Sequence, residues 1–238
     1  MSLALLDHLT PWCRDRLERF LAGPGALHAY MIHVGAGWAY ARLPWLRIRL
    51  NHTIGRLDPL LRWLAVDGFG FHEGYFAWAR VGLRQQVPGG IKGYARRAFD
   101  HGLGRSLWFV NCADAQRVSQ TIAQFDESRR ADLWSGIGLA CAYAGGYTEP
   151  DLSELYVATE SYRTEMAQGA AFAAKARLRA GNLVLHTERA CQVFCGIPAR
   201  EAAEITDAAL KNLPQDGPQP AFEIWRQRIQ REFARVRR

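Results

Sequence analysis

Apolar residues recur at three- and four-residue intervals along most of this chain, and the strict alternation typical of a β-strand is scarce. Glycine, proline and capping residues, such as Asp114 and Asp126, divide the pattern into segments of helical length. The stretch 44–56 has the weakest helical pattern, which favours a loop or a short hairpin arm. The pattern therefore predicts an all-α protein of about nine to eleven helices. We expect helices over residues 3–21, 26–43, 57–81, 91–110, 114–125, 129–144, 162–180, 186–195, 198–213 and 221–236, with a further run opening at Pro150.

Five of these helices carry two small residues that are separated by one residue, and this motif returns about every 34 residues. Such a period is typical of stacked two-helix units, each of which buries its apolar face against its neighbours. A glycine inside a helix costs about 1 kcal/mol relative to alanine, so we expect these pairs to lie where helix backbones approach closely. The motifs are Gly35-Ala36-Gly37, Gly68-Phe69-Gly70, Gly102-Leu103-Gly104, Gly136-Ile137-Gly138 and the weaker Gly169-Ala170-Ala171.

The period predicts one domain of stacked helical hairpins, either α-solenoid-like or a compact α/α array. We expect the terminal helices over 198–236 to cap the last repeat, because Phe222, Trp225, Ile229, Phe233 and Val236 form an apolar stripe on a basic helix. Binding of that helix to a membrane or an anionic partner is the alternative. The repeats are predicted near residues 26–56, 57–90, 91–125, 126–159 and 160–195.

Stacking would place the same helical position of every repeat on one surface. Four positions around each first glycine fall within about 80° of the helical wheel, and they mix charged, polar and aromatic side chains. Such a stripe fits a concave ligand site, and it also fits a buried polar network between repeats. The candidate substrate-binding residues on it are Trp38, Phe71, Arg105, Trp108, Asp132, Ser135, Gln168 and Lys175.

Two pairs of residues are candidates for acid–base chemistry. Asp67 and His101 occupy the same position in adjacent repeats and could meet, either as a structural pair or as a proton-transfer pair. A carboxylate beside an imidazole favours the protonated ring, which is the form that a general acid needs. The second candidate pair is His72 and Glu73, in the segment Gly-Phe-His-Glu-Gly. No second histidine follows at the spacing of a zinc motif, and no dinucleotide or phosphate loop is present, so we expect neither a metal nor a cofactor.

Composition narrows the class of protein. Apolar residues make up 49% and charged residues 22% of the 238 residues, as in an ordinary globular protein. The net charge is +7, and six arginines fall within 226–238, which we interpret as a basic surface and not as a nucleic-acid site. The five cysteines form no paired framework and predict buried free thiols. Without a signal-like start or a long apolar run, we expect a cytoplasmic protein that does not insert stably into membranes.

Six segments spread along the chain carry a resemblance to a known family. They are HAYMIHVGAGWAYARL, LLRWLAVDGFGFHEGYF, RRAFDHGLGRSLWFV, RRADLWSGIGLACAYAGG, AQGAAFAAKARLRAGN and HTERACQVFCG. Through them the chain resembles an uncharacterised bacterial family, a domain of unknown function found in enediyne and related secondary-metabolite gene clusters. The resemblance implies a role in natural-product biosynthesis, near polyene or polyketide intermediates, and it carries no established catalytic residues. Members of this family usually continue upstream, so the chain is expected to open inside an element.

Two hypotheses follow. In the first, the protein binds an apolar intermediate and steers a redox-neutral cyclisation or isomerisation; Asp67 and His101 move protons, while Arg105 and Lys175 hold an anionic or carbonyl end. The rings of Trp38, Phe71 and Trp108 would stack on the bound chain. In the second, the helices form a non-catalytic scaffold for a partner such as a synthase. The partners considered are therefore a hydrophobic small molecule, a synthase protein and a second copy of the chain, but no nucleic acid.

Overall fold

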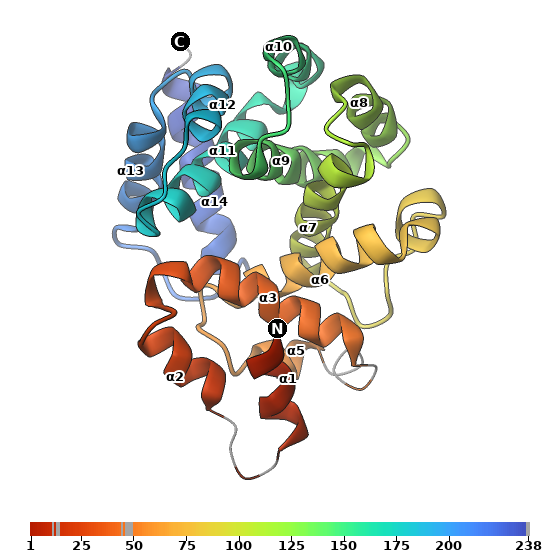
Figure 1. The fold of residues 1–238 in the computed structure, drawn as a ribbon, viewed down its shortest axis with the longest axis vertical. Coiled ribbons are helices and arrows are strands. Elements are labelled where there is room, and N and C mark those ends of the chain that lie inside the picture. The colour runs from red at the N-terminus through yellow and green to blue at the C-terminus, as the bar shows by residue number, and fades with distance from the viewer. Residues whose placement is uncertain (11, 13–14, 44, 46–49, 237–238) are drawn as a thin grey trace. The chain divides into compact units, whose positions relative to one another are not determined.

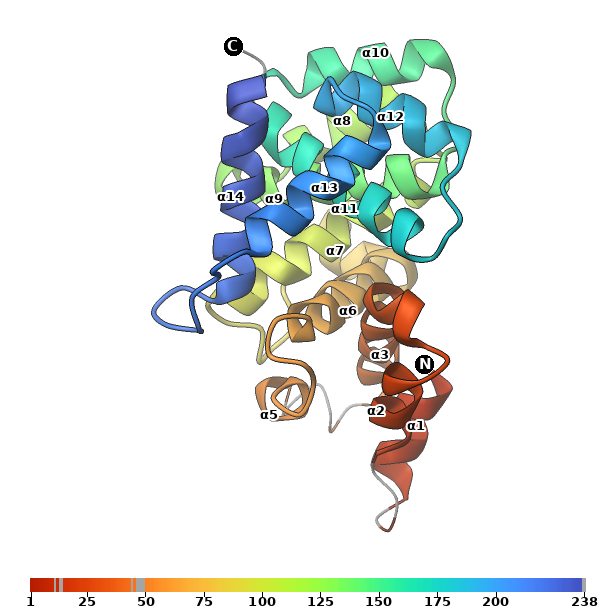
Figure 2. The same cartoon turned by 90° about the vertical axis from the view of Figure 1, so that its left-hand side faces the viewer.

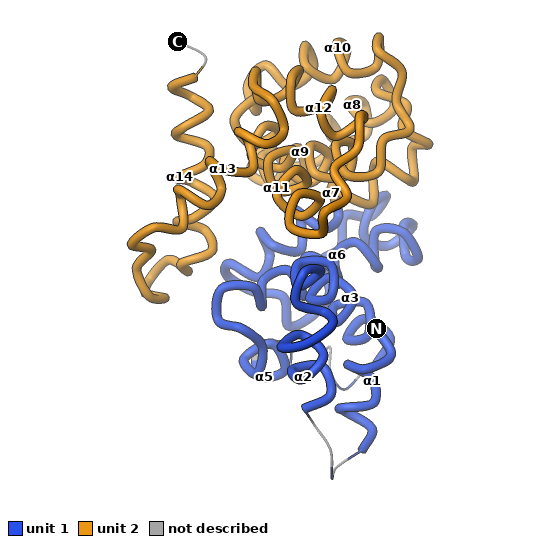
Figure 3. Tube along the Cα trace, turned by 60° about the vertical axis from the view of Figure 1, so that its left-hand side comes forward, with its two compact units in different colours: residues 1–103 blue, residues 104–238 orange. Residues whose placement is uncertain are grey.

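The described part of the chain is helical. The structure is a computed structural model that describes residues 1–10, 12, 15–43, 45 and 50–236. These residues form helices joined by turns and contain no β-strand, which confirms the predicted all-α class. The chain divides into two compact units, Met1–Leu103 and Gly104–Arg238, and the boundary falls within helix α7 (Figure 3). The single domain expected from the sequence stays a prediction.

Unit 1 is organised around the helices α3 and α6, which pack along each other (Figure 1). The buried positions of α3 are mostly small, so the two helices can approach closely. The short helix η2 after α6 is a π-helical turn. The elements of unit 1 are α1 (Ser2–Leu9), α2 (Arg16–Ala22), η1 (Ala26–His28), α3 (Ala29–Arg42), α5 (Leu50–Ile54), α6 (Arg62–Phe76), η2 (Ala79–Leu83) and the first part of α7 (Tyr94–Val110).

Unit 2 is built around α11, which contacts α9, α12, α13 and α14 (Figures 1 and 2). The middle of α11 is rich in alanine and almost wholly inaccessible to solvent, which lets helices pack on several of its sides. The elements are the last part of α7, α8 (Ala115–Ala123), α9 (Glu127–Ala144), α10 (Glu149–Ala158), η3 (Glu160–Tyr162), α11 (Arg163–Arg179), α12 (Leu185–Cys195), α13 (Ala199–Leu210) and α14 (Ala221–Val236).

Local capping sets several of these boundaries. The Asp114 carboxylate accepts the backbone N–H of Arg117 and caps α8, and the Asp126 carboxylate accepts that of Ser128 and caps α9. Both caps were predicted from the sequence and are confirmed. Gly145 ends α9 at a φ of 68°, a conformation that a residue with a side chain adopts at a cost.

Three predicted segments differ from the structure. Residues 3–21 form two helices, because Thr10 precedes Pro11 and is extended, with φ −117° and ψ 109°. The helix expected over 57–81 begins only at Arg62, since the Asp58 carboxylate accepts the N–H groups of Leu60 and Leu61 in a local turn. Within 44–56, the described residues include the short helix α5 and not a hairpin. The described residues therefore contain more helices than the nine to eleven predicted.

The glycine-bearing helices touch backbone to backbone. A methyl group on Gly102 would overlap the carbonyl oxygen of Asp67 on α6, and one on Gly169 would overlap that of Ser135 on α9. The contacts follow one rule. The first glycine of a motif lies against the residue that precedes the motif on the preceding glycine-bearing helix, as Gly102 does against Asp67. The last glycine of a motif lies against the residue three positions before the motif on the following glycine-bearing helix, as Gly70 does against Phe99. The observed contacts are Gly37 with Ala65, Gly68 with Val34, Gly70 with Phe99 and Gly102 with Asp67 in unit 1, and Gly104 with Leu133, Gly138 with Met166 and Gly169 with Ser135 in unit 2.

Candidate functional site

A buried carboxylate and a buried imidazole meet within unit 1. His101 Nδ1 lies 2.5 Å from Asp67 Oδ2, and the two residues are 5% and 2% exposed. Gly102 follows His101 in α7 and lets that backbone rest on the Asp67 carbonyl, so the two side chains come within hydrogen-bonding reach. A hydrogen bond to a charged group is short and strong in a low-dielectric interior. We call this pair the buried dyad.

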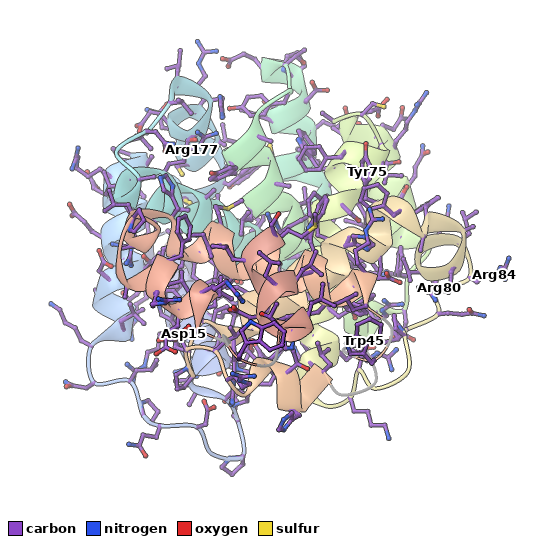
Figure 4. All side chains as sticks on the ribbon, turned by 60° about the horizontal axis from the view of Figure 1, so that its bottom comes forward. Asp15, Trp45, Tyr75, Arg80, Arg84 and Arg177 are labelled. Atoms are coloured by element: carbon purple, nitrogen blue, oxygen red, sulfur yellow. The ribbon has the colours of Figure 1, made fainter. Side chains whose placement is uncertain are left out.

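A second polar group of unit 1 lies at the end of α6. His72 Nδ1 is 3.3 Å from Glu73 Oε1, and the other oxygen of Glu73 pairs with the Arg80 guanidinium. The rings of Trp38 and Phe76 flank His72, in a T-shaped and a tilted arrangement, with centroid distances of 5.6 and 4.8 Å. Figure 4 labels Arg80, which belongs to η2 just after α6. We call His72, Glu73, Arg80, Trp38 and Phe76 the His72 cluster.

Aromatic rings extend this cluster along α3 and α6. Trp38 lies 5.4 Å from Phe71 and 5.6 Å from Phe76, and the Arg42 guanidinium stands 5.1 Å above the Phe76 ring. Phe76 is 53% exposed, and Tyr75, labelled in Figure 4, packs against it. Trp38 and Phe71 occupy equivalent positions on their helices, so the predicted register brings these two rings together. The surface offers flat π-faces beside polar groups.

The polar candidates of unit 2 form a buried network. Ser135 donates to Gln168 Oε1 at 2.8 Å, and Arg226 Nε donates to the same oxygen at 3.0 Å. Arg226 also pairs with Asp132 at 2.8 Å and with Glu223 at 3.2 Å. Asp132, Ser135 and Gln168 thus fit the alternative of a polar network between helices, with charged groups that are paired as burial requires.

Sequence reasoning missed Arg226 and Glu223. Arg226 lies four residues after Phe222 and three before Ile229, so it shares the face of the apolar stripe of α14. A charged residue at such a position is a sign of a buried ion pair, because an unpaired charge there would be costly. The basic character of the terminal helix hid this signal.

The remaining candidates have structural partners or buried positions. Trp108 is 1% exposed, and its indole N–H donates to the Gly145 carbonyl at 2.9 Å. Lys175 Nζ lies 2.6 Å from Asp207 Oδ2. Arg105 is buried. The core position of Trp108 and the ion pair of Lys175 account for these two side chains without a ligand.

Other titratable groups are also buried. His33 Nδ1 donates to the Ala29 carbonyl at 2.7 Å, and burial lowers the pKa of His33 in spite of that bond and of the nearby Asp58 charge. Burial raises the pKa of the Cys141 thiol, while Cys191 and Cys195 donate to backbone carbonyls of α11. The expectation of buried thiols is confirmed for these three cysteines.

One described cysteine departs from that expectation, because Cys112 is exposed just after α7; Cys13 lies outside the described residues.

No group of three potential metal ligands is found among the residues that the structure describes. Within the same residues, no helix combines the length and the apolar character needed to cross a bilayer.

Comparison with known proteins gives a family. A family model described as "Protein of unknown function (DUF1702)" matches residues 1–233. The chain belongs to the DUF1702 family. No curated protein and no solved structure matches the chain. The resemblance to a domain-of-unknown-function family is thereby confirmed, while the association of DUF1702 with enediyne gene clusters stays a prediction.

Proposed function

We propose that the protein binds a largely apolar intermediate of natural-product biosynthesis and catalyses a redox-neutral cyclisation or isomerisation. The buried dyad carries this proposal, since Asp67 Oδ2 and His101 Nδ1 lie 2.5 Å apart in the interior of unit 1. A carboxylate at Nδ1 fixes the tautomer and orientation of an imidazole and stabilises its protonated form, so that the ring can take and return a proton at Nε2. Cyclisation and double-bond migration need such transfers and no external oxidant.

The aromatic rings of α3 and α6 supply the binding part of this proposal. Phe71 lies one helical turn after Asp67 on the same face of α6, and Trp38 packs against Phe71. A site with apolar aromatic walls and a few polar groups suits an unsaturated hydrocarbon chain. The predicted association of the family with enediyne gene clusters supports a polyene or polyketide-like intermediate, and it supports a cytoplasmic site of action.

Complementation tests the catalytic proposal. A producing strain that lacks the gene would receive the wild-type chain, the double variant Asp67→Asn/His101→Gln, or Glu232→Gln as a control on an exposed ion pair. We expect the double variant to lose the product and the control to restore it, with circular dichroism confirming that both fold. Normal product from the folded double variant would exclude the dyad from the reaction.

A scaffold is the second candidate, and the glycine contacts favour it. We propose that the glycine-bearing helices are copies of one two-helix repeat, near the ranges predicted from the sequence, since the same backbone contacts recur in each unit. Helical-repeat arrays commonly bind other proteins. Affinity capture against the co-encoded synthase would test this role, with a stoichiometric complex expected. A dyad variant that still forms the complex but yields no product would assign both roles to the chain.

A further inference from the structure

The ring of His72 presents an unsatisfied nitrogen. His72 is 6% exposed, and its Nε2 atom is buried without a hydrogen-bond partner among the described residues. An unpaired buried polar atom destabilises the folded chain by about 1–3 kcal/mol, so native structures rarely leave one without a water or a ligand. A water or a ligand group from outside the chain would satisfy this atom.

The neighbours of His72 decide what that group must be. Glu73 is nearly inaccessible to solvent and is held as a carboxylate by Arg80, so His72 Nδ1 carries the hydrogen that faces Glu73 Oε1. A neutral imidazole that carries its hydrogen on Nδ1 has a lone pair and no hydrogen on Nε2, so Nε2 accepts a hydrogen bond. The missing partner is therefore a donor.

The rings around His72 narrow the ligand further. The Trp38 and His72 rings form a T-shaped pair, and the Phe76 ring lies 4.8 Å from the His72 ring at a tilt of 42°. Aromatic rings favour flat, unsaturated molecules. Phe76 is also half exposed, so one side of the cluster borders solvent, from which a ligand can approach. We propose that the His72 cluster binds the hydroxyl group of a flat, unsaturated ligand, a phenol or an enol, through His72 Nε2.

This inference rests on the proposed function only for the aromatic wall, and its test requires no turnover. β-Naphthol and its methyl ether have the same fused rings, but only the naphthol can donate a hydrogen bond. Titration of the full chain with each probe near pH 8, followed by calorimetry, gives two dissociation constants. We expect the naphthol to bind about three- to tenfold more tightly than the ether, as one buried hydrogen bond predicts.

Variants locate the preference. His72→Phe keeps an aromatic ring against Trp38 and removes the acceptor, so the two probes should bind equally. Tyr75→Phe removes a neighbouring hydroxyl and should leave the preference unchanged. Asp67→Asn/His101→Gln should leave it unchanged as well, so a failure of the dyad and a failure of the His72 site can be told apart.

Three outcomes would overturn the inference. They are equal affinity of the two probes for the wild-type chain, a preference that survives in folded His72→Phe, and the absence of binding by either probe.

Discussion

The close approach of α3 and α6 can be tested at two glycines of the same helix. In an open helix, Gly→Ala stabilises by about 1 kcal/mol. At Gly37 an added Cβ would stand 2.7 Å from the Phe69 nitrogen and 2.9 Å from the Ala65 carbonyl carbon, whereas ordinary contacts are 3.4 Å or more. These atoms belong to the backbone of α6, so no side chain can rotate away. At Gly35 the nearest atom is the Met1 nitrogen, at 3.3 Å.

The expected effects have opposite directions. Gly37→Ala forces two packed helices apart, and overpacking of this kind costs about 1–3 kcal/mol. Separation also weakens dispersion contacts along the pair and places the cost near the top of that range, so we expect a net loss of about 2 kcal/mol after the gain of about 1 kcal/mol in helix propensity. Gly35→Ala should lie between no change and a gain of about 1 kcal/mol.

Urea denaturation followed by tryptophan fluorescence and far-UV circular dichroism measures both variants. Because the chain divides into two compact units, the transition that responds to the substitution is the one to compare. If Gly37→Ala is as stable as Gly35→Ala, the two backbones are not in contact at this point and the explanation of the glycine pairs is wrong.

Three further predictions concern buried groups. Arg226→Ala removes the guanidinium that pairs with two buried carboxylates and should lower the free energy of unfolding by about 3–5 kcal/mol, whereas Arg235→Ala, in an exposed pair, should change it by less than about 1 kcal/mol in chemical denaturation. The pKa of His33 is lowered in the folded chain, so the unfolded chain takes up this proton at a higher pH than the folded chain does. The free energy of unfolding should therefore fall as the pH drops below about 6.5, and it should fall less in His33→Gln. Thermal melts at a series of pH values measure both effects. Cys112→Ser should remove one thiol that reacts rapidly with a thiol reagent in the native chain, while the three buried thiols react only on unfolding.

The sequence was informative where a position could be deduced from helical register. Asp67 and His101 occupy one register position, as do Ser135 and Gln168, and each pair is joined by a hydrogen bond. The register fixes which side chains face a neighbouring helix, because the glycines bring the backbones together at a constant offset. The break after Thr10 was missed, although proline disfavours helix at the preceding residue.

The helical register of the glycine motifs gives no information about the elements that lack such a motif. Arg226 meets Asp132 across 94 positions of the chain, on a helix with no glycine pair, so no periodicity could connect them. The same holds for Trp108, whose partner is the carbonyl of Gly145 in the turn after α9. The path of such a turn is decided by tertiary packing, and a single sequence does not encode it in a local pattern.

The glycine contacts and the polar pairs have a common cause. Gly102 faces the Asp67 carbonyl, and the preceding residue, His101, reaches the Asp67 carboxylate; Gly169 faces the Ser135 carbonyl, and the preceding residue, Gln168, reaches the Ser135 hydroxyl. In each pair, the two side chains can reach each other only because the glycine, which lacks a methyl group, lets the two helix backbones approach closely.

The proposed activity should therefore depend on Gly102 itself. Gly102→Ala pushes α7 away from α6 and lengthens the bond of the dyad without altering either of its residues. Gly169→Ala imposes the same overlap in unit 2 and leaves the dyad untouched. In the complementation assay, at a temperature where both variants are folded, we expect the first to lose far more product than the second. An equal loss in both would mean that the dyad matters only through stability, and the acid–base role would then have no support.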